Sequence, residues 1–304
     1  MSNIIPLLPT FSDGGKPHVA IFLSGSGSNA ERILKAWQAA GDGARFEVVA
    51  LVTDAPKTSR ALELGQLFGL PVIAEDIRDF YHARGETRVS IATPAGQAVR
   101  QQWTDALRQK LAPMQVTFGL FAGFVPLTNL TQDFPCLNVH PGDLTYLKDG
   151  QRHLVGLHEI PIERAILEGL DYLRSSVILA GAYSGRGDDM DNGAILGISA
   201  PMEMEVSEEQ LAHFQEIASK RPERRPPGGF KDELEAFAAE QQNRLKVAGD
   251  WTVFPPVVQD FADNRFYADT ESGALFFRRN QGGLLPIQTV QYDADGGREF
   301  IIGT

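Results

Sequence analysis

The stretch His18-Val-Ala-Ile-Phe-Leu-Ser-Gly-Ser-Gly-Ser-Asn-Ala30 decides the fold, because it combines an apolar run, a glycine-rich turn and the start of a helix. The run up to Leu23 predicts a buried strand. Ser28 and Glu31 match a capping box, and Gly41 is a suitable helix stop. Apolar residues between these signals recur at the spacing of one helical face: Ala30, Ile33, Leu34 and Trp37. The segment therefore predicts a strand, a turn and a helix.

Strand and helix signals continue to alternate as far as about residue 200. Further strands are expected at 48–52, 71–74, 116–121, 135–139, 176–180 and 194–198. Helices are expected at 59–68, from Thr93 and Pro94 onward, and at 162–167. Residues 76–93 are polar and patternless, so we expect an excursion or flap there. This alternation predicts an α/β protein, with a mostly parallel, Rossmann-like sheet and helices on both faces.

The second part of the chain departs from this alternation. Residues 220–229 hold three prolines and two glycines, which predicts a surface loop. A helical pattern follows and is expected to end near Gly249. We therefore expect one domain over 1–304, with an α/β core at 18–200, an insertion or linker at 201–230 and a C-terminal helix and strand extension at 231–304.

Composition excludes several classes of partner and chemistry. The 304 residues carry a formal net charge of −11, which argues against long-range attraction to nucleic acid or to a membrane surface. No apolar run has the ~18–20 residues of a spanning helix, and residues 1–16 do not resemble a secretory signal. We therefore expect a cytoplasmic protein. The one cysteine, Cys136, excludes an internal disulfide and a Cys-cluster metal site, and its apolar surroundings predict a buried hydrophobic role.

The glycine turn leaves three interpretations open. The segment Gly25-Ser-Gly27-Ser-Asn-Ala30 fits the dinucleotide pattern G-x-G-x-x-A, and Asp54 ends the second strand, where an adenosine ribose could bind. A nicotinamide-dependent oxidoreductase is one interpretation. The same backbone can hold any phosphate at the helix N-terminus, which is the second. The third is a tight turn without a ligand.

Polar side chains gather at the end of a later strand. Asn138 and His140 are two residues apart, so they project from one face at the carboxyl end, where open α/β sheets bind ligands. Asp191 precedes another strand and could reach the same edge. A lone histidine is more often structural, and Asp191 lies in Asp-Asn-Gly, a favoured turn sequence. The three residues together predict an active site.

Four motifs in fixed order resemble the family of phosphoribosylglycinamide formyltransferases, the folate-dependent enzymes of purine biosynthesis. They are Ser24-Gly-Ser-Gly-Ser-Asn29, Phe121-Ala-Gly-Phe124, Asn138-Val-His-Pro141 and Met190-Asp-Asn-Gly193. Asp250-Trp-Thr-Val-Phe-Pro255 looks like the start of the closing helix of that family. The resemblance spans about residues 18–290 with insertions, and it implies a single formyltransferase domain.

The resemblance also implies a role for each site residue. The catalytic residues would be Asn138, His140 and Asp191. The substrate phosphate would bind Gly25, Ser26, Gly27, Ser28 and Asn29, and the substrate ribose would bind Asp250, although an aspartate there could also cap a helix or lie in solvent. The folate would contact Val125, Pro126, Leu127, Asp188 and Asp189. It further implies 10-formyltetrahydrofolate as cosubstrate, no metal, small-molecule substrates only, and a monomer or homodimer.

These residue types suit formyl transfer. Attack of an amine on the formyl carbon creates an oxyanion, and one preorganised donor to it is worth ~2.7–4 kcal/mol. Asn138 and a protonated His140 are suitable donors, and Asp191 would favour the imidazolium form and accept or relay the amine proton.

The chain departs from the family pattern at 142–150 and at Ile178, on the acceptor side. The resemblance implies glycinamide ribonucleotide as the acceptor, and these departures leave a nucleotide-linked amino sugar as the alternative. A non-catalytic relative that binds a phosphorylated metabolite is a further alternative, besides the nicotinamide-dependent oxidoreductase.

Overall fold

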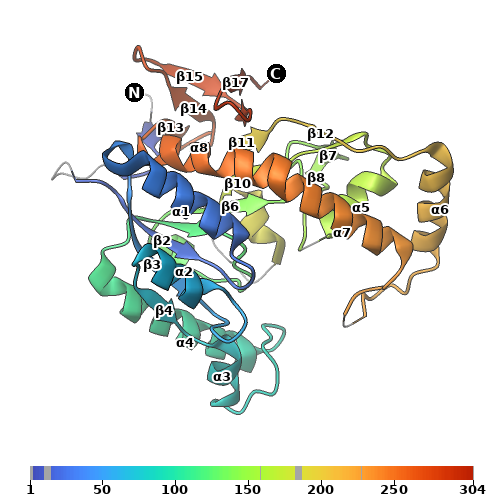
Figure 1. The fold of residues 1–304 in the computed structure, drawn as a ribbon, viewed down its shortest axis with the longest axis horizontal. Coiled ribbons are helices and arrows are strands. Elements are labelled where there is room, and N and C mark those ends of the chain that lie inside the picture. The colour runs from blue at the N-terminus through green and yellow to red at the C-terminus, as the bar shows by residue number, and fades with distance from the viewer. Residues whose placement is uncertain (1–2, 10–14, 158, 182–186, 227, 304) are drawn as a thin grey trace.

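A computed structural model describes residues 3–9, 15–157, 159–181, 187–226 and 228–303, without the side chains of 187–189. Its main element is a sheet of nine strands within these residues, in the order β17-β16-β11-β10-β6-β5-β2-β3-β4 (Figure 1). The strands are β2 (His18–Phe22), β3 (Glu47–Thr53), β4 (Val72–Ala74), β5 (Phe118–Phe121), β6 (Cys136–His140), β10 (Ser176–Leu179), β11 (Ile195–Ser199), β16 (Thr289–Tyr292) and β17 (Arg298–Ile301).

Most neighbouring strands of this sheet run parallel, as predicted. β4, β3, β2, β5 and β6 form a parallel block, and β11 pairs in parallel with β16. β10 is antiparallel to both β6 and β11, and β17 is antiparallel to β16. The chain leaves β2 toward β3 and later returns on the other side of β2 at β5. This reversal of strand order forms a crevice at the carboxyl ends, where open α/β sheets bind ligands.

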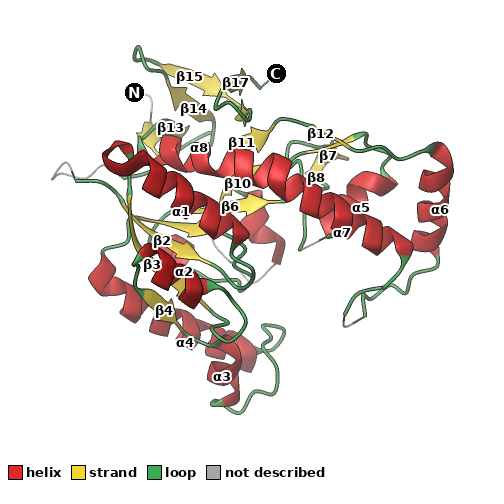
Figure 2. Cartoon of the chain, in the orientation of Figure 1, coloured by secondary structure: helices red, strands yellow, loops and turns green. Residues whose placement is uncertain are grey.

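Helices cover both faces of the sheet (Figure 2). One face packs against α1 (Ser28–Ala40), α2 (Ala61–Phe68) and α8 (Trp251–Ala262). The other face packs against α3 (Ile77–His82) and α4 (Pro94–Leu111). The predicted α/β class with helices on both faces is therefore confirmed.

Two local predictions near the first strands are wrong. The helix α1 begins without the expected capping box, because Gly27 is the N-cap with φ of 63° and Ser28 is already helical. Residues 77–82, expected as part of a flap, form the helix α3. That helix is capped by the Asp76 carboxylate, which accepts hydrogen bonds from the backbone N–H groups of Arg78 and Asp79 at 3.0 and 3.1 Å.

The helix expected to end near Gly249 continues instead. α7 (Glu233–Leu245) runs through a π-helical turn at Lys246–Asp250 into α8. A Cβ atom at Gly249 would lie 2.4 Å from Ser175 Oγ, so the glycine permits close packing and does not stop the helix. The π turn brings Asp250 to a buried position at the start of α8.

The region beyond residue 200 is more regular than a linker. The expected insertion at 201–230 contains β12 (Met202–Glu203), paired with β9 (Tyr172–Leu173), and α6 (Glu208–Ser219), which packs with α5 (Ile160–Leu167) and α7. A second sheet, β1-β13-β14-β15, includes strands from the C-terminal part. Because β16 pairs with β11, the main sheet extends past the expected core boundary at residue 200.

The remaining elements are short. They are β1 (Ile4–Pro6), β13 (Phe266–Asp269), β14 (Leu275–Arg278), β15 (Leu284–Ile287), the hairpin β7 (Leu147–Lys148) and β8 (Gln151–Arg152), and the 3₁₀ turns at Gly41–Gly43, Ala112–Met114, Leu130–Gln132 and Gly187–Asn192. Among the described helices, none has the length and apolarity required to cross a bilayer.

Candidate active site

The strand β6 presents the Asn138 and His140 pair at its carboxyl end. Alternation along the strand places both on one face, while Leu137 and Val139 pack into the core on the other face. His140 is buried, and its Nε2 donates a hydrogen bond to the carbonyl oxygen of Leu154 at 2.7 Å. Since a carbonyl only accepts, Nε2 carries a proton and Nδ1 is the nitrogen that can exchange one.

Asp191 lies beside that nitrogen, at the end of the 3₁₀ turn Gly187–Asn192. Its Oδ2 is 3.9 Å from His140 Nδ1, which is an ion-pair distance and longer than a hydrogen bond. A carboxylate at this distance stabilises positive charge on the imidazole through Coulombic attraction. The structure thus brings together the three predicted catalytic residues.

Arg152, on the hairpin strand β8, fixes the turn that carries Asp191. Its Nη1 donates to the carbonyl oxygen of Asp191, and its Nη2 donates to the carbonyl oxygen of Gly193 at 2.8 Å. A Cβ atom at Gly193 would lie 1.7 Å from the carbonyl oxygen of Leu179, so only glycine fits there. Burial lowers the pKa of Arg152, and the charge of Asp191 opposes that shift. The hairpin therefore positions the Asp191 turn.

Asp250 connects the start of α1 with the residue that precedes β10. Its Oδ1 accepts a hydrogen bond from Ser175 Oγ at 2.5 Å, and its Oδ2 accepts one from Asn29 Nδ2 at 2.9 Å. Burial raises the pKa of Asp250, and the hydrogen bonds and the nearby His140 oppose the rise. Asp250 thus neither caps a helix through its side chain nor lies in solvent, the two alternatives considered for it.

The glycine turn offers its backbone to a ligand at one position and to the core at another. Gly27 faces the core, because a Cβ atom there would lie 2.9 Å from Leu23 Cδ1 and 3.0 Å from Leu64 Cδ1. Gly25 has open space around it. Arg60 fixes the turn through two hydrogen bonds. Its backbone N–H donates to the carbonyl oxygen of Gly25 at 3.1 Å, and its Nη1 donates to the carbonyl oxygen of Ser26 at 3.2 Å. The first N–H groups of α1 have no intrahelical partner, which suits an anion.

The expected folate wall follows β5. The backbone N–H of Val125 donates to Ser24 Oγ at 3.0 Å, and the carbonyl oxygen of Leu127 accepts from Nη1 of the buried Arg100 at 2.8 Å. Pro126 between them is buried. The side chains of Asp188 and Asp189 lie outside the part of the chain that the structure describes.

Sequence reasoning missed the residues that orient the site. Ser175 directly precedes the strand expected at 176–180, which is a weak signal, whereas Arg152 and Arg100 have no signal in the sequence. Among the described residues, no group of three or more His, Cys, Asp or Glu side chains is arranged to hold a metal ion.

Comparison with known proteins identifies the fold. No family model and no curated protein matches the sequence. The structure is similar to phosphoribosylglycinamide formyltransferase from Coxiella burnetii, with 16% identity, a TM-score of 0.55, and coverage of 89% of this chain and 96% of that one. It is also similar to the same enzyme from Anaplasma phagocytophilum, with 16% identity, a TM-score of 0.53, and coverage of 95% of this chain and 98% of that one. For glycinamide ribonucleotide transformylase 1 from Symbiobacterium toebii, the identity is 18%, the TM-score is 0.51, and the match covers 83% of this chain and 91% of that one. The chain therefore has the formyltransferase fold.

Proposed function

We propose that the protein transfers a formyl group from 10-formyltetrahydrofolate to the amine of a phosphorylated acceptor. One observation carries the proposal: Asn138, His140 and Asp191 converge at the carboxyl edge of a sheet whose fold is that of three solved formyltransferases. Side chains that come from separate segments and meet in the ligand crevice favour catalysis over a structural role.

In the proposed reaction, the amine attacks the formyl carbon and the folate N10 leaves. The Asn138 amide and a proton on His140 Nδ1 stabilise the oxyanion of the tetrahedral intermediate. The hydrogen bond from Nε2 to Leu154 fixes the imidazole ring, so the same nitrogen faces both the reacting group and Asp191. Asp191 accepts the proton that the amine loses, directly or through water, and a proton passes back to the folate N10 as the bond between N10 and the formyl carbon breaks.

The acceptor lies between the glycine turn and Asp250 in this proposal. Its phosphate meets the open Gly25 and the N-terminus of α1, and its sugar hydroxyls approach Asp250 and Asn29. The buried Oδ1 atom of Asn29 has no hydrogen-bond partner among the described residues, so a ligand hydroxyl can satisfy it. Glycinamide ribonucleotide meets these requirements and is the first acceptor to test, with a nucleotide-linked amino sugar as the second. The folate lies along Val125, Pro126 and Leu127.

The test is turnover by the purified full-length chain. 10-Formyltetrahydrofolate is mixed with each amine, and mass spectrometry detects the formylated product. Glycinamide ribonucleotide should be formylated, and His140→Ala or Asp191→Asn should reduce kcat by at least about 100-fold. His213→Ala is the matched control, because this exposed histidine lies at the surface, where it pairs with Glu233. Absence of formylation with every amine refutes the proposal, and full activity of His140→Ala refutes the residue roles.

A nicotinamide-dependent oxidoreductase is the rival from another class. The observation that favours it is the position of Asp54, which follows β3 beside the glycine turn. It predicts that NAD, and not a folate, raises the melting temperature. A non-catalytic relative predicts stabilisation by a phosphorylated ligand without formyl transfer.

A further inference from the structure

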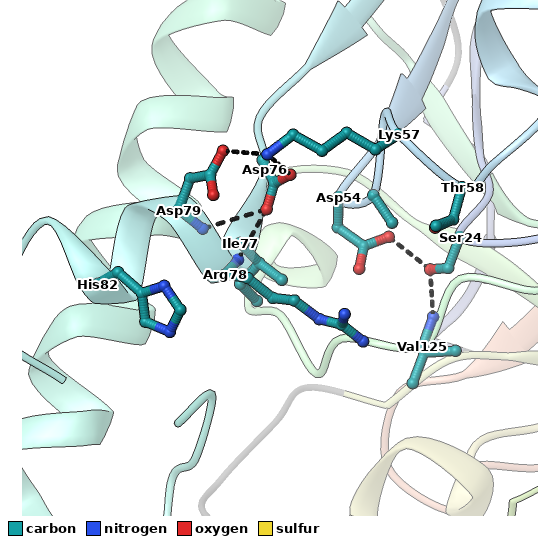
Figure 3. Close-up of a pocket in the computed structure, with 11 residues that line it drawn as sticks. Ser24, Asp54, Lys57, Thr58, Asp76, Ile77, Arg78, Asp79, His82 and Val125 are labelled. Carbon is teal, nitrogen blue, oxygen red and sulfur yellow. Dashed lines mark hydrogen bonds and ion pairs between the residues drawn. The ribbon is translucent and has the colours of Figure 1, made fainter. Parts of the chain in front are cut away.

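A pocket lies away from the candidate active site, where the last turns of α8 meet β14 and β17 (Figure 1). Its volume is about 430 Å³, within the range of small-molecule sites. Asp260 on its wall is separated from Asp250 by about 15 Å of helix. The crevice drawn in Figure 3, which adjoins the expected folate wall, shares no lining residue with this pocket. The pocket is therefore distinct from the site proposed for formyl transfer.

Arginines dominate the charged lining of this pocket. Arg265, Arg279 and Arg298 line it together with one carboxylate, that of Asp260, which gives the lining a formal charge of +2. The whole chain, in contrast, has a formal net charge of −11. A concave region that gathers positive charge on an acidic protein attracts anions locally. The charge of the lining therefore indicates an anionic ligand.

The guanidinium of Arg298 is held in place by buried partners. Its Nε and Nη2 donate to the two carboxylate oxygens of Asp260 at 2.6 and 2.8 Å, and Asp260 is 5% exposed. The hydroxyl of the buried Tyr292 donates to the same carboxylate at 2.8 Å. These contacts leave Nη1 of Arg298 without a hydrogen bond to the described residues. Because the ion pair is already formed, Arg298 can donate to a ligand without first being ordered.

The other two arginines differ in their partners. Arg265 donates from Nε to Asp263 Oδ2 at 2.6 Å and from Nη1 to the carbonyl oxygen of Arg278 at 3.3 Å, so its charge is compensated and Nη2 stays available. The side chain of Arg279 is exposed and has no hydrogen bond or ion pair with the described residues. Arg279 therefore supplies the positive charge of the lining that no carboxylate of the described chain neutralises.

An aromatic wall adjoins these cations. Phe277 and Phe300 complete this side of the lining, and their ring centroids are 5.0 Å apart with an angle of 52° between the planes. Alternation along β17 places Arg298 and Phe300 on the same face of the strand. A ligand that fills the pocket therefore meets guanidinium groups and phenyl rings side by side.

We propose that this pocket binds a small organic anion in which a phosphate or carboxylate group is attached to an aromatic ring. The anionic group pairs with Arg279 and accepts hydrogen bonds from Arg265 and Arg298, because planar guanidinium groups suit the oxygens of both anions. The ring of the ligand lies against Phe277 and Phe300.

The experiment is calorimetric titration of the full chain with phenyl phosphate and with phthalate, which carry one phosphate or two carboxylates on the same ring. Inorganic phosphate and maleate are the matched probes without the ring. We expect an aromatic anion to bind about tenfold more tightly than its matched probe, because part of the ring is buried. The tighter of the two aromatic anions identifies the anionic group. Arg279→Ala should weaken its binding about tenfold or more, and Arg279→Glu should abolish it.

Arg224→Ala is the matched control, because Arg224 is an exposed arginine between α6 and α7 that does not line the pocket. It should bind both anions as the wild type does. Gly25→Ala alters the turn proposed to hold the acceptor phosphate and should leave the binding that depends on Arg279 unchanged, so the result is independent of formyl transfer.

Two outcomes would overturn the proposal. If neither aromatic anion binds, or if Arg279→Ala and Arg279→Glu bind them like the wild type, the pocket is not an anion site. If the probes without the ring bind as tightly as the aromatic anions, the ring does not lie against Phe277 and Phe300. Because Arg279 is exposed and has no partner among the described residues, its variants should fold, which circular dichroism checks.

Discussion

Replacement of Gly27 by alanine should destabilise the protein strongly, for two reasons visible in the turn. Gly27 has φ of 63°, and an L-residue in this conformation costs ~1–2 kcal/mol. The added methyl group would lie 2.9 and 3.0 Å from the Cδ1 atoms of Leu23 and Leu64, and such overpacking costs ~1–3 kcal/mol. Together the two terms predict a loss of roughly 2–5 kcal/mol. That is a large part of the 5–15 kcal/mol typical of a folded domain.

Urea unfolding followed by circular dichroism measures this loss, with an unchanged slope expected if the unfolded state is unaffected. Gly25→Ala is the matched control, because the surroundings of Gly25 are open and its backbone is not left-handed. It should change the free energy of unfolding by less than about 0.5 kcal/mol. It should nevertheless weaken binding of a phosphorylated acceptor, since its methyl group would occupy the approach to the turn. Equal stability of the two variants would refute the packing argument.

Three further predictions concern the site and the core. Arg152→Met should lower kcat about 10- to 100-fold with little change in KM, because Asp191 loses its anchored turn; steady-state kinetics with Lys148→Met as the hairpin control tests this, and an equal loss in both variants contradicts it. Burial raises the pKa of Asp250, so the folded state retains this proton above about pH 4, where the unfolded chain loses it. Relative to Asp250→Asn, the stability of the wild type should therefore fall as the pH rises above about 4, and the difference between the two should be constant below that pH, as measured by urea unfolding at several pH values. Burial also raises the pKa of the Cys136 thiol, so a thiol reagent should label it only as fast as the protein unfolds, and rapid labelling of the native protein would contradict this.

The sequence was informative where structure is local. The segment from His18 to Ala30 predicted its strand, turn and helix, because continuous apolar runs and helical spacing are short-range signals. The end of the helix at Gly249 was wrongly predicted, because this glycine is selected by contact with Ser175, which lies far away in the chain. The joining of β16 to β11 was missed for the same reason, since strand partners are a tertiary property.

For the candidate site too, the sequence predicted the local features and not the long-range contacts. The spacing of Asn138 and His140 placed both on one strand face, and their order with Asp191 pointed to one family. The anchoring of Asp191 by Arg152 could not be predicted, because it depends on how a hairpin lies against a turn about 40 residues later. The sequence likewise did not show that Gly25 is exposed while Gly27 is packed against the core, because both positions hold the same residue type.

The hydrogen bond between Asn29 and Asp250 has a consequence for biosynthesis. The two residues are 221 positions apart, so the contact cannot form until residue 250 has left the ribosome. A nascent chain can pair β2, β3, β5 and β6 much earlier, and it already carries Asn138 and His140 at that stage. It still lacks Asp250, whose carboxylate accepts the hydrogen bond from Asn29. The crevice is therefore complete only after α7 and the start of α8 have been synthesised.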